Sequence, residues 1–220
     1  MALILAAVLF IAVFSYLAAR FDYPDVLDRP AADVLPRLIA LGHTGRAVWL
    51  LYALIPLLLV PAGVGVWVAL RGVASGAARS AAAFATIAGF SMMLGLARWP
   101  TIQWELGQAY ASATPAERPA LAALFTGLNS YLGNFIGEFV GELALNLFFL
   151  LTSYALMRTR RRSKIGFAGV IVSVLGFGAM FRNVTPLVAL AAEVNNFVLP
   201  IWLVVLGIVL AREPGVTPAP

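Results

Sequence analysis

The chain has 220 residues, of which 62% are hydrophobic and 11% charged, and it carries a net charge of +5. Soluble domains average roughly 45–50% apolar and about 25% charged residues, so this composition excludes an ordinary soluble protein and indicates a helical membrane protein. The chain lacks cysteine and has one histidine, His43, which excludes disulfides, cysteine metal centres and bis-histidine haem ligation within one chain.

Six apolar segments have the length needed to cross about 30 Å of hydrocarbon. In chain order they are Ala2–Ala19, Ala47–Leu70, Ala78–Ala97, Gly133–Met157, Ile165–Phe181 and Pro186–Ala211. The first lacks a basic leading region, so we interpret it as a retained span and not a secretion signal. The sequence therefore predicts an all-α, polytopic bundle of six transmembrane helices, kinked at Pro56, Pro61 and Pro200.

The distribution of arginine and lysine predicts the orientation of the chain. The loop after the second span holds Arg71 and Arg79 without an acid, and the loop after the fourth is "RTRRRSK". Residues 20–46 hold four arginines and four aspartates, which cancel. The positive-inside rule places both basic loops and both termini on the cytoplasmic side of the membrane, and it explains the net charge without nucleic-acid binding.

The first long outer loop is predicted to end in a short interfacial helix. Its apolar residues Val34, Leu35, Leu38, Ile39 and Leu41 can share one helical face. His43 follows in the same loop and is interpreted as a surface residue. The tryptophans Trp49, Trp99 and Trp104 fall at the predicted outer boundary and suggest an interfacial belt.

The second long outer loop contains a capping box. Thr114 and Glu117 flank Pro115, which predicts a helix that begins near Pro115. An unbroken helix from there to Arg158 would be about 65 Å long, twice the thickness of the hydrocarbon. We therefore expect a break or bend between Asn129 and Gly133, separating an interfacial helix from the fourth span.

The segment "GNFIGEFVGELALN" places polar side chains inside an apolar span. Its polar residues Asn134, Glu138, Glu142 and Asn146 recur at every fourth position and form one stripe on a helix. Three glycines, Gly133, Gly137 and Gly141, form a second stripe that favours close approach of another helix. We expect the polar stripe to face the interior of the bundle, because a carboxylate in lipid is costly.

Charged residues of other spans are expected at the same depth. Arg98 ends the third span, Arg182 ends the fifth, and Glu193 lies with Asn195 and Asn196 near the start of the sixth. We expect Arg98 to contact at least one glutamate, and three acids facing two arginines leave one carboxylate to bind a cation or a proton. The candidate ligand-binding residues are Glu142 and Glu193 as the central pair, with Glu138, Arg98, Arg182, Asn134, Asn146 and Asn196 around them.

These residues allow three interpretations. The first is an outward-facing pocket for transport or sensing of a small ligand or cation. The second is a structural or regulatory subunit in which the polar network fixes helix packing. The third, an intramembrane enzyme with Glu138 or Glu142 as general base, lacks a second catalytic group, so no catalytic residue, metal ligand or cofactor is predicted. The expected partners are the lipid bilayer and either a second copy of the chain or another membrane protein.

Four stretches carry a resemblance to a known family. They are "FDYPDVLDRPAADVLPRL", "LGLARW", "YLGNFIGEFVGE" and a late Glu with Asn before "PIWLVVLGIVL". The chain resembles the bacterial domain-of-unknown-function 4386 family over about residues 5–212. The resemblance implies a small six-span inner-membrane protein and supplies no reaction or ligand. We expect one domain, residues 1–212, and a disordered cytoplasmic tail, residues 213–220.

Overall fold

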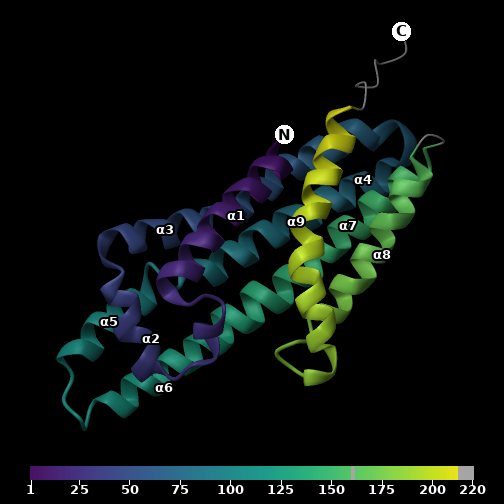
Figure 1. The fold of residues 1–220 in the computed structure, drawn as a ribbon. Helices are drawn as coiled ribbons and strands as arrows, with labels where there is room; N and C mark the ends of the chain where they lie inside the picture. The colour runs from purple at the N-terminus through teal and green to yellow at the C-terminus, as the bar shows by residue number, and fades with distance from the viewer. Residues whose placement is uncertain (160–161, 213–220) are drawn as a thin grey trace.

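The computed structural model describes residues 1–159 and 162–212, and these residues form helices, turns and no strand (Figure 1). The expected tail, residues 213–220, lies outside the described part. The elements are α1 (Ala2–Phe21), η1 (Asp25–Asp28), α2 (Ala31–Ala40), α3 (Gly42–Leu54), η2 (Ile55–Leu58), α4 (Leu59–Ala97), α5 (Ile102–Ser112), α6 (Arg118–Leu128), η3 (Asn129–Val140), α7 (Gly141–Met157), α8 (Ser163–Ala179), η4 (Pro186–Val188) and α9 (Ala189–Ala211). The predicted all-α class is confirmed.

Helix α4 is folded back on itself at Ala74, whose backbone leaves the helical region at φ −148° and ψ 66°. The two arms pack closely, since a Cβ on Gly63 would lie 2.8 Å from the Cβ of Ala85. The arms correspond to the second and third predicted spans. The first arm continues from α3 through the short 3₁₀ turn η2, which contains Pro56, so this proline interrupts the regular helix as expected.

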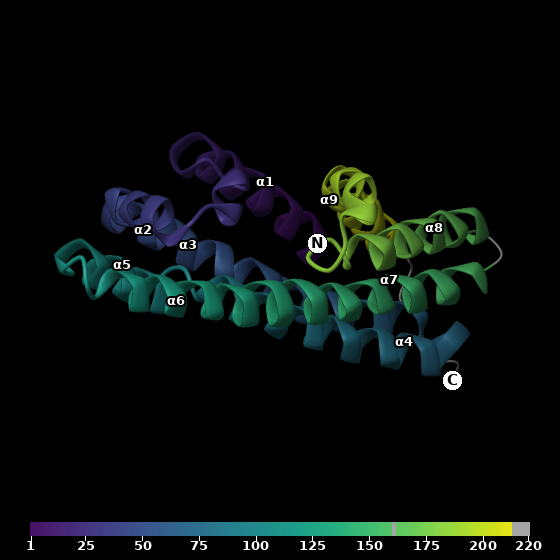
Figure 2. The same ribbon diagram turned by 90° about the horizontal axis from the view of Figure 1, so that it is seen from below.

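One long helix, formed by α6, η3 and α7, runs without interruption from Arg118 to Met157 over 40 residues (Figures 1 and 2). Of the predicted break or bend between Asn129 and Gly133, the break is therefore wrong. The irregularity is instead the π-helical stretch η3, which widens the turns without ending the helix. The helix also begins at Arg118 and not near Pro115, which lies in a turn.

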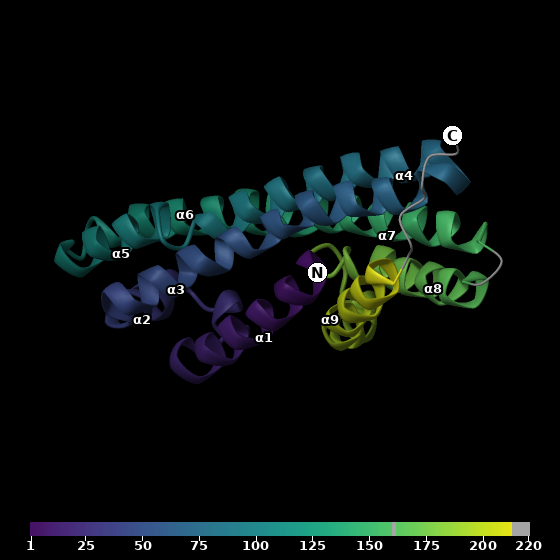
Figure 3. The ribbon, with the colours of Figure 1, turned by 90° about the horizontal axis from the view of Figure 1, so that it is seen from above.

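The helices are arranged around the layer made by α4 and the long helix. Figures 2 and 3 show α1 and α9 on the same side of this layer. These two helices meet near the chain ends, where a Cβ on Gly207 would lie 2.8 Å from Cγ1 of Ile4. Near the end of α9, the Nη1 of Arg162 donates to the carbonyl of Val209 at 2.6 Å. The start of α1, the fold at Ala74, the start of α8 and the end of α9 thus lie at one end of the molecule (Figure 1).

Four helical stretches among the described residues are long and apolar enough to cross a membrane. They are Ala2–Phe21, Gly42–Ser112, Arg118–Met157 and Pro186–Ala211. Helix α8 is apolar but has 17 residues. The count differs from the predicted six because the stretch of 71 residues from Gly42 to Ser112 contains the α4 hairpin, and because α8 is short.

The tryptophans expected at the membrane interface are instead buried in an aromatic cluster. Trp49, Trp99 and Trp104 are 0%, 1% and 3% exposed, and the rings of Trp49 and Trp99 stack with centroids 4.9 Å apart. The interfacial-belt prediction is wrong for these three. The reason is that η1 and α2 fold over them, with Val26, Val34, Leu35 and Leu38 in the same cluster. The predicted short helix exists as α2, with its apolar face buried.

Candidate functional site

One arginine holds two carboxylates at the centre of the site. Arg182 lies between α8 and η4, and its Nη1 donates to Oε2 of Glu142 at 3.0 Å while Nη2 contacts the other oxygen of that carboxylate. The Nε and Nη2 atoms lie 3.2 and 3.1 Å from Oε2 of Glu138. The planar guanidinium fork matches this paired recognition, which a lysine could not reproduce.

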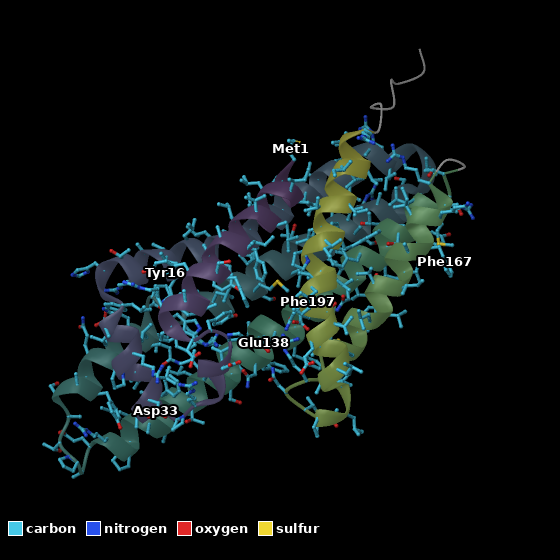
Figure 4. All side chains as sticks on the ribbon, viewed as in Figure 1. Met1, Tyr16, Asp33, Glu138, Phe167 and Phe197 are labelled. Atoms are coloured by element: carbon cyan, nitrogen blue, oxygen red, sulfur yellow. The ribbon has the colours of Figure 1, made fainter. Side chains whose placement is uncertain are left out.

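The two glutamates reach Arg182 because they lie four positions apart on one continuous helix. Glu138 is near the end of η3 and Glu142 is in the first turn of α7. Figure 4 labels Glu138 on this helix, between α1 and α9 in that view. The amide of Asn183 adds a further hydrogen bond, with Nδ2 donating to Oε2 of Glu138 at 2.6 Å. The predicted polar stripe therefore faces the connection between α8 and α9.

The cluster carries unequal charge and is partly accessible. Its side chains are 28% exposed at Glu138, 13% at Glu142 and 27% at Arg182. Burial alone would lower the pKa of Arg182, but the carboxylates of Glu142 and Glu138 raise it above its ordinary value, so the guanidinium stays charged. Two ionised carboxylates around one guanidinium leave a net negative charge.

The predicted contact between Arg98 and a glutamate is wrong. Arg98 is 5% exposed, its Nε donates to Oδ1 of Asn129 at 2.9 Å and its Nη1 donates to the carbonyl of Gly95. The guanidinium also lies 5.0 Å from the ring centroid of Trp99. The reason is local geometry, because the side chain lies directly over Gly133, where a Cβ would come 2.6 Å from its Cζ.

The predicted close approach at the glycine stripe is confirmed. A Cβ on Gly137 would lie 2.9 Å from the Cα of Gly95, and one on Gly141 would lie 2.7 Å from Cγ of Met92. Both partners belong to the second arm of α4. The long helix thus presents its glycines to α4 and its carboxylates to Arg182.

The remaining predicted residues lie apart from the Arg182 cluster. Glu193 and Asn196 are exposed on α9, and neither makes a side-chain hydrogen bond or ion pair within the described part of the chain. Asn146 is buried, and its amide lies against Gly176 of α8. Asn134 is half-buried on η3. The structure therefore brings Glu138, Glu142 and Arg182 together and does not bring Glu193 to them.

Sequence reasoning missed Asn129, Asn183 and Tyr23. Asn183 could have been found from its position beside Arg182, whereas Asn129 had no sequence signal that pointed to Arg98. Tyr23, in the loop after α1, packs edge-on against the rings of Trp49 and Tyr52, and burial raises its pKa. The same aromatic cluster borders Arg98 through Trp99.

The fold and site define a class: an all-α protein with helices long and apolar enough to cross a membrane and with a cluster of two carboxylates and an arginine between helices. Within the described residues, no group of three or more His, Cys, Asp or Glu side chains could hold a metal ion. The chain belongs to the family described as Domain of unknown function (DUF4386), whose model matches residues 1–207. Neither a curated protein nor a solved structure matches the chain.

Proposed function

We propose that the protein is a multi-pass protein of the bacterial inner membrane that binds a small cation or a proton at Glu138 and Glu142, in transport or sensing. The observation that carries this proposal is the sharing of one guanidinium by two partly exposed carboxylates, which leaves one negative charge uncompensated. Intramembrane carboxylates are costly unless they are paired or bind a cation. In the proposed topology the cluster lies toward the outer side of the membrane.

Six crossings follow if the α4 hairpin counts as two and α8 as one. With 17 residues, α8 spans about 25 Å at 1.5 Å per residue, close to the thickness of the hydrocarbon. The basic residues Arg71, Arg79 and Lys164 belong to the segments at the end of the molecule where α1 begins. The positive-inside rule makes that end cytoplasmic.

The side chains of the cluster favour a small cationic ligand over an anion. Arg182 is already engaged by both glutamates, so the free acceptor capacity belongs to carboxylate oxygens. A proton or a monovalent cation would remove the net charge. Among the described residues, Asn134, Asn146, Asn196, Arg98 and Glu193 form no hydrogen bond or ion pair with Arg182, Glu138 or Glu142, so this proposal assigns them no contact with the ligand.

The test is thermal unfolding of the purified protein in detergent, with sodium, potassium or choline chloride at constant ionic strength and across a pH series. We expect sodium, potassium or added protons to raise the unfolding temperature of the natural protein relative to choline at neutral pH. Glu142→Gln and Glu138→Gln should each weaken that response. Glu105→Gln is the matched control, because this exposed carboxylate pairs only with Arg46 among the described residues. An equal response in all variants would refute the site.

A structural role is the rival function, and one observation favours it. Arg182 and Asn183 together tie the connection between α8 and α9 to the long helix through Glu138 and Glu142. In that case neither cations nor pH would shift unfolding selectively, and Glu142→Gln would lower stability under every condition. A second copy of the chain or another membrane protein would then be the functional partner.

A further inference from the structure

A pocket separate from the Arg182 cluster lies where α1 ends beside the end of α2. A pocket of about 280 Å³ opens there, lined by Tyr16 and Arg20 of α1 and by Arg37, Ala40 and Leu41 at the end of α2. Tyr16 and Arg20 are four residues apart, and Arg37 and Leu41 are four residues apart, so each helix turns one face to the pocket. Figure 4 labels Tyr16 on the half of α1 that lies next to α2.

The two arginines of this pocket have donors to spare. Arg20 makes no hydrogen bond or ion pair with the described residues. Arg37 has one ionic contact, at 3.9 Å from Oδ2 of Asp22, and that carboxylate is held more closely by Arg29. The arginines and aspartates of residues 20–46 cancel in number, but in space they leave two guanidinium groups facing one cavity.

The chemistry of this arrangement selects an oxyanion. Two planar guanidinium groups with a phenol beside them match the oxygens of a phosphate, which arginine binds through paired hydrogen bonds. The apolar Leu41 also lines the pocket.

The position of the pocket along α1 indicates that this phosphate belongs to a lipid headgroup. Arg20 is in the last turn of α1, where the chain leaves its apolar helix. Below it α1 exposes Leu5, Val8 and Ile11, which are 49%, 57% and 53% exposed, a surface on which acyl chains can lie. Tyrosine and arginine at the end of a membrane helix lie at the level of the lipid headgroups.

We propose that Tyr16, Arg20 and Arg37 bind the phosphate of a phospholipid, with its acyl chains along α1. This proposal does not depend on the function proposed for the Arg182 cluster. The binding energy comes from the guanidinium–phosphate hydrogen bonds, so it requires the phosphate and both arginines. The apolar face of α1 adds a contribution that free phosphate cannot obtain.

The experiment measures lipid binding to the full-length protein in detergent by native mass spectrometry. The probes are phosphatidylglycerol, diacylglycerol with the same acyl chains, and inorganic phosphate. The variants are Arg20→Gln, Arg37→Gln and their combination, and Arg79→Gln is the matched control because it removes the same charge from an exposed arginine at the Ala74 fold. We expect the natural protein and Arg79→Gln to bind phosphatidylglycerol, and the double variant to bind it at least about tenfold more weakly, which equals about 1.4 kcal/mol.

Several outcomes would overturn the proposal. If diacylglycerol bound as tightly as phosphatidylglycerol, the phosphate would not be the group that the pocket recognises. Inorganic phosphate binding as tightly would make the site one for the free ion. If Arg79→Gln weakened lipid binding as much as the double variant does, the loss of binding would be explained by the change in net charge alone. If the double variant does not fold, the single variants Arg20→Gln and Arg37→Gln decide, and unchanged lipid binding in both would refute the site.

Discussion

Arg182 is the only cation within hydrogen-bonding distance of Glu138 and Glu142 among the described residues. The two carboxylates lie on one face of the long helix and share this guanidinium, so their pairing depends on this one side chain. Without it, two like charges would remain at short range in a partly buried place, a situation that costs more than losing one exposed salt bridge.

We expect Arg182→Ala to lower the free energy of unfolding by about 3 kcal/mol, the low end of the range for breaking a buried pair, because the cluster is partly exposed. Adding Glu142→Gln should restore part of the loss, since one of the unpaired charges is then removed. The measurement is denaturation in detergent, with Glu193→Gln as the control for an exposed glutamate. A double variant no more stable than Arg182→Ala would show that the pair contributes no net interaction.

At the scale of single residues, the sequence indicated which charged residues lie in the site but not which of them contact one another. Spacing placed Glu138 and Glu142 on one helical face, and the end of the fifth span placed Arg182 at a suitable depth. The partner of Arg98 could not be read, because it depends on the contact of the side chain with Gly133 and on the amide of Asn129 one turn earlier. Such choices are set by packing between helices that are distant in sequence.

At the scale of elements, the glycine stripe lies on the side of the long helix that packs against α4. Gly133, Gly137 and Gly141 come close to Arg98, Gly95 and Met92, respectively. The periodicity predicted this stripe. No residue pattern indicated the π-helical stretch η3, which contains the first two of these glycines.

A comparison of two glycines on the long helix tests this packing. Gly133→Ala places a methyl group against the Arg98 guanidinium, and we expect it to destabilise the protein by about 1–3 kcal/mol, as overpacking does. Gly127→Ala meets no atom within 4 Å, and we expect it to be neutral or to stabilise the helix by up to about 1 kcal/mol. Unfolding temperatures measured side by side decide the point, and equal effects would contradict the tight contact.

The turn before α6 gives a pH-dependent test. The carboxylate of Glu117 accepts hydrogen bonds from the backbone N–H and the hydroxyl of Thr114, each at 2.8 Å, and these bonds lower its pKa. A lowered pKa in the folded state means that the contribution to stability is complete above the ordinary pKa of glutamate and is lost as the pH falls through the lowered value.

We therefore expect Glu117→Gln to be less stable than the natural protein at neutral pH, with a small difference because the site is exposed. The difference should shrink on acidification and vanish once Glu117 itself is protonated. Thermal unfolding of both proteins over a pH series measures it, and a difference independent of pH would contradict the ionised cap.

At the scale of the whole molecule, the first, fifth and sixth predicted apolar segments reappear as helices close to their predicted ends, as α1, α8 and η4 with α9. The second and third correspond to the stretch from α3 to the end of α4, and the Arg71–Arg79 region is where α4 turns back. The positions of these helices could be predicted because the hydrophobic pattern of the sequence marks them. The uninterrupted helix from Arg118 to Met157 could not be predicted from the thickness of the bilayer, because α2 and α5 pack beside its first turns and support them outside the apolar region.

The topology prediction uses the absence of cysteine in the chain. Single cysteines at Ser75 and Ser163, exposed at the end where α1 begins, should react with an impermeant reagent only in inverted vesicles. A cysteine at Ser112, exposed at the opposite end, should react in intact cells. If Ser163→Cys were labelled from outside intact cells, the predicted orientation would be wrong.

The hairpin in α4 has a consequence for how the chain is made. Its two arms pair around Ala74 through contacts such as that of Gly63 with Ala85, so they find each other within a short stretch of chain as soon as both have been synthesised. The contact between Ile4 and Gly207 joins α1 to α9, so it can form only after α9 has been synthesised. Until then the face of α1 that packs against α9 is uncovered, and a chain truncated before α9 leaves it so.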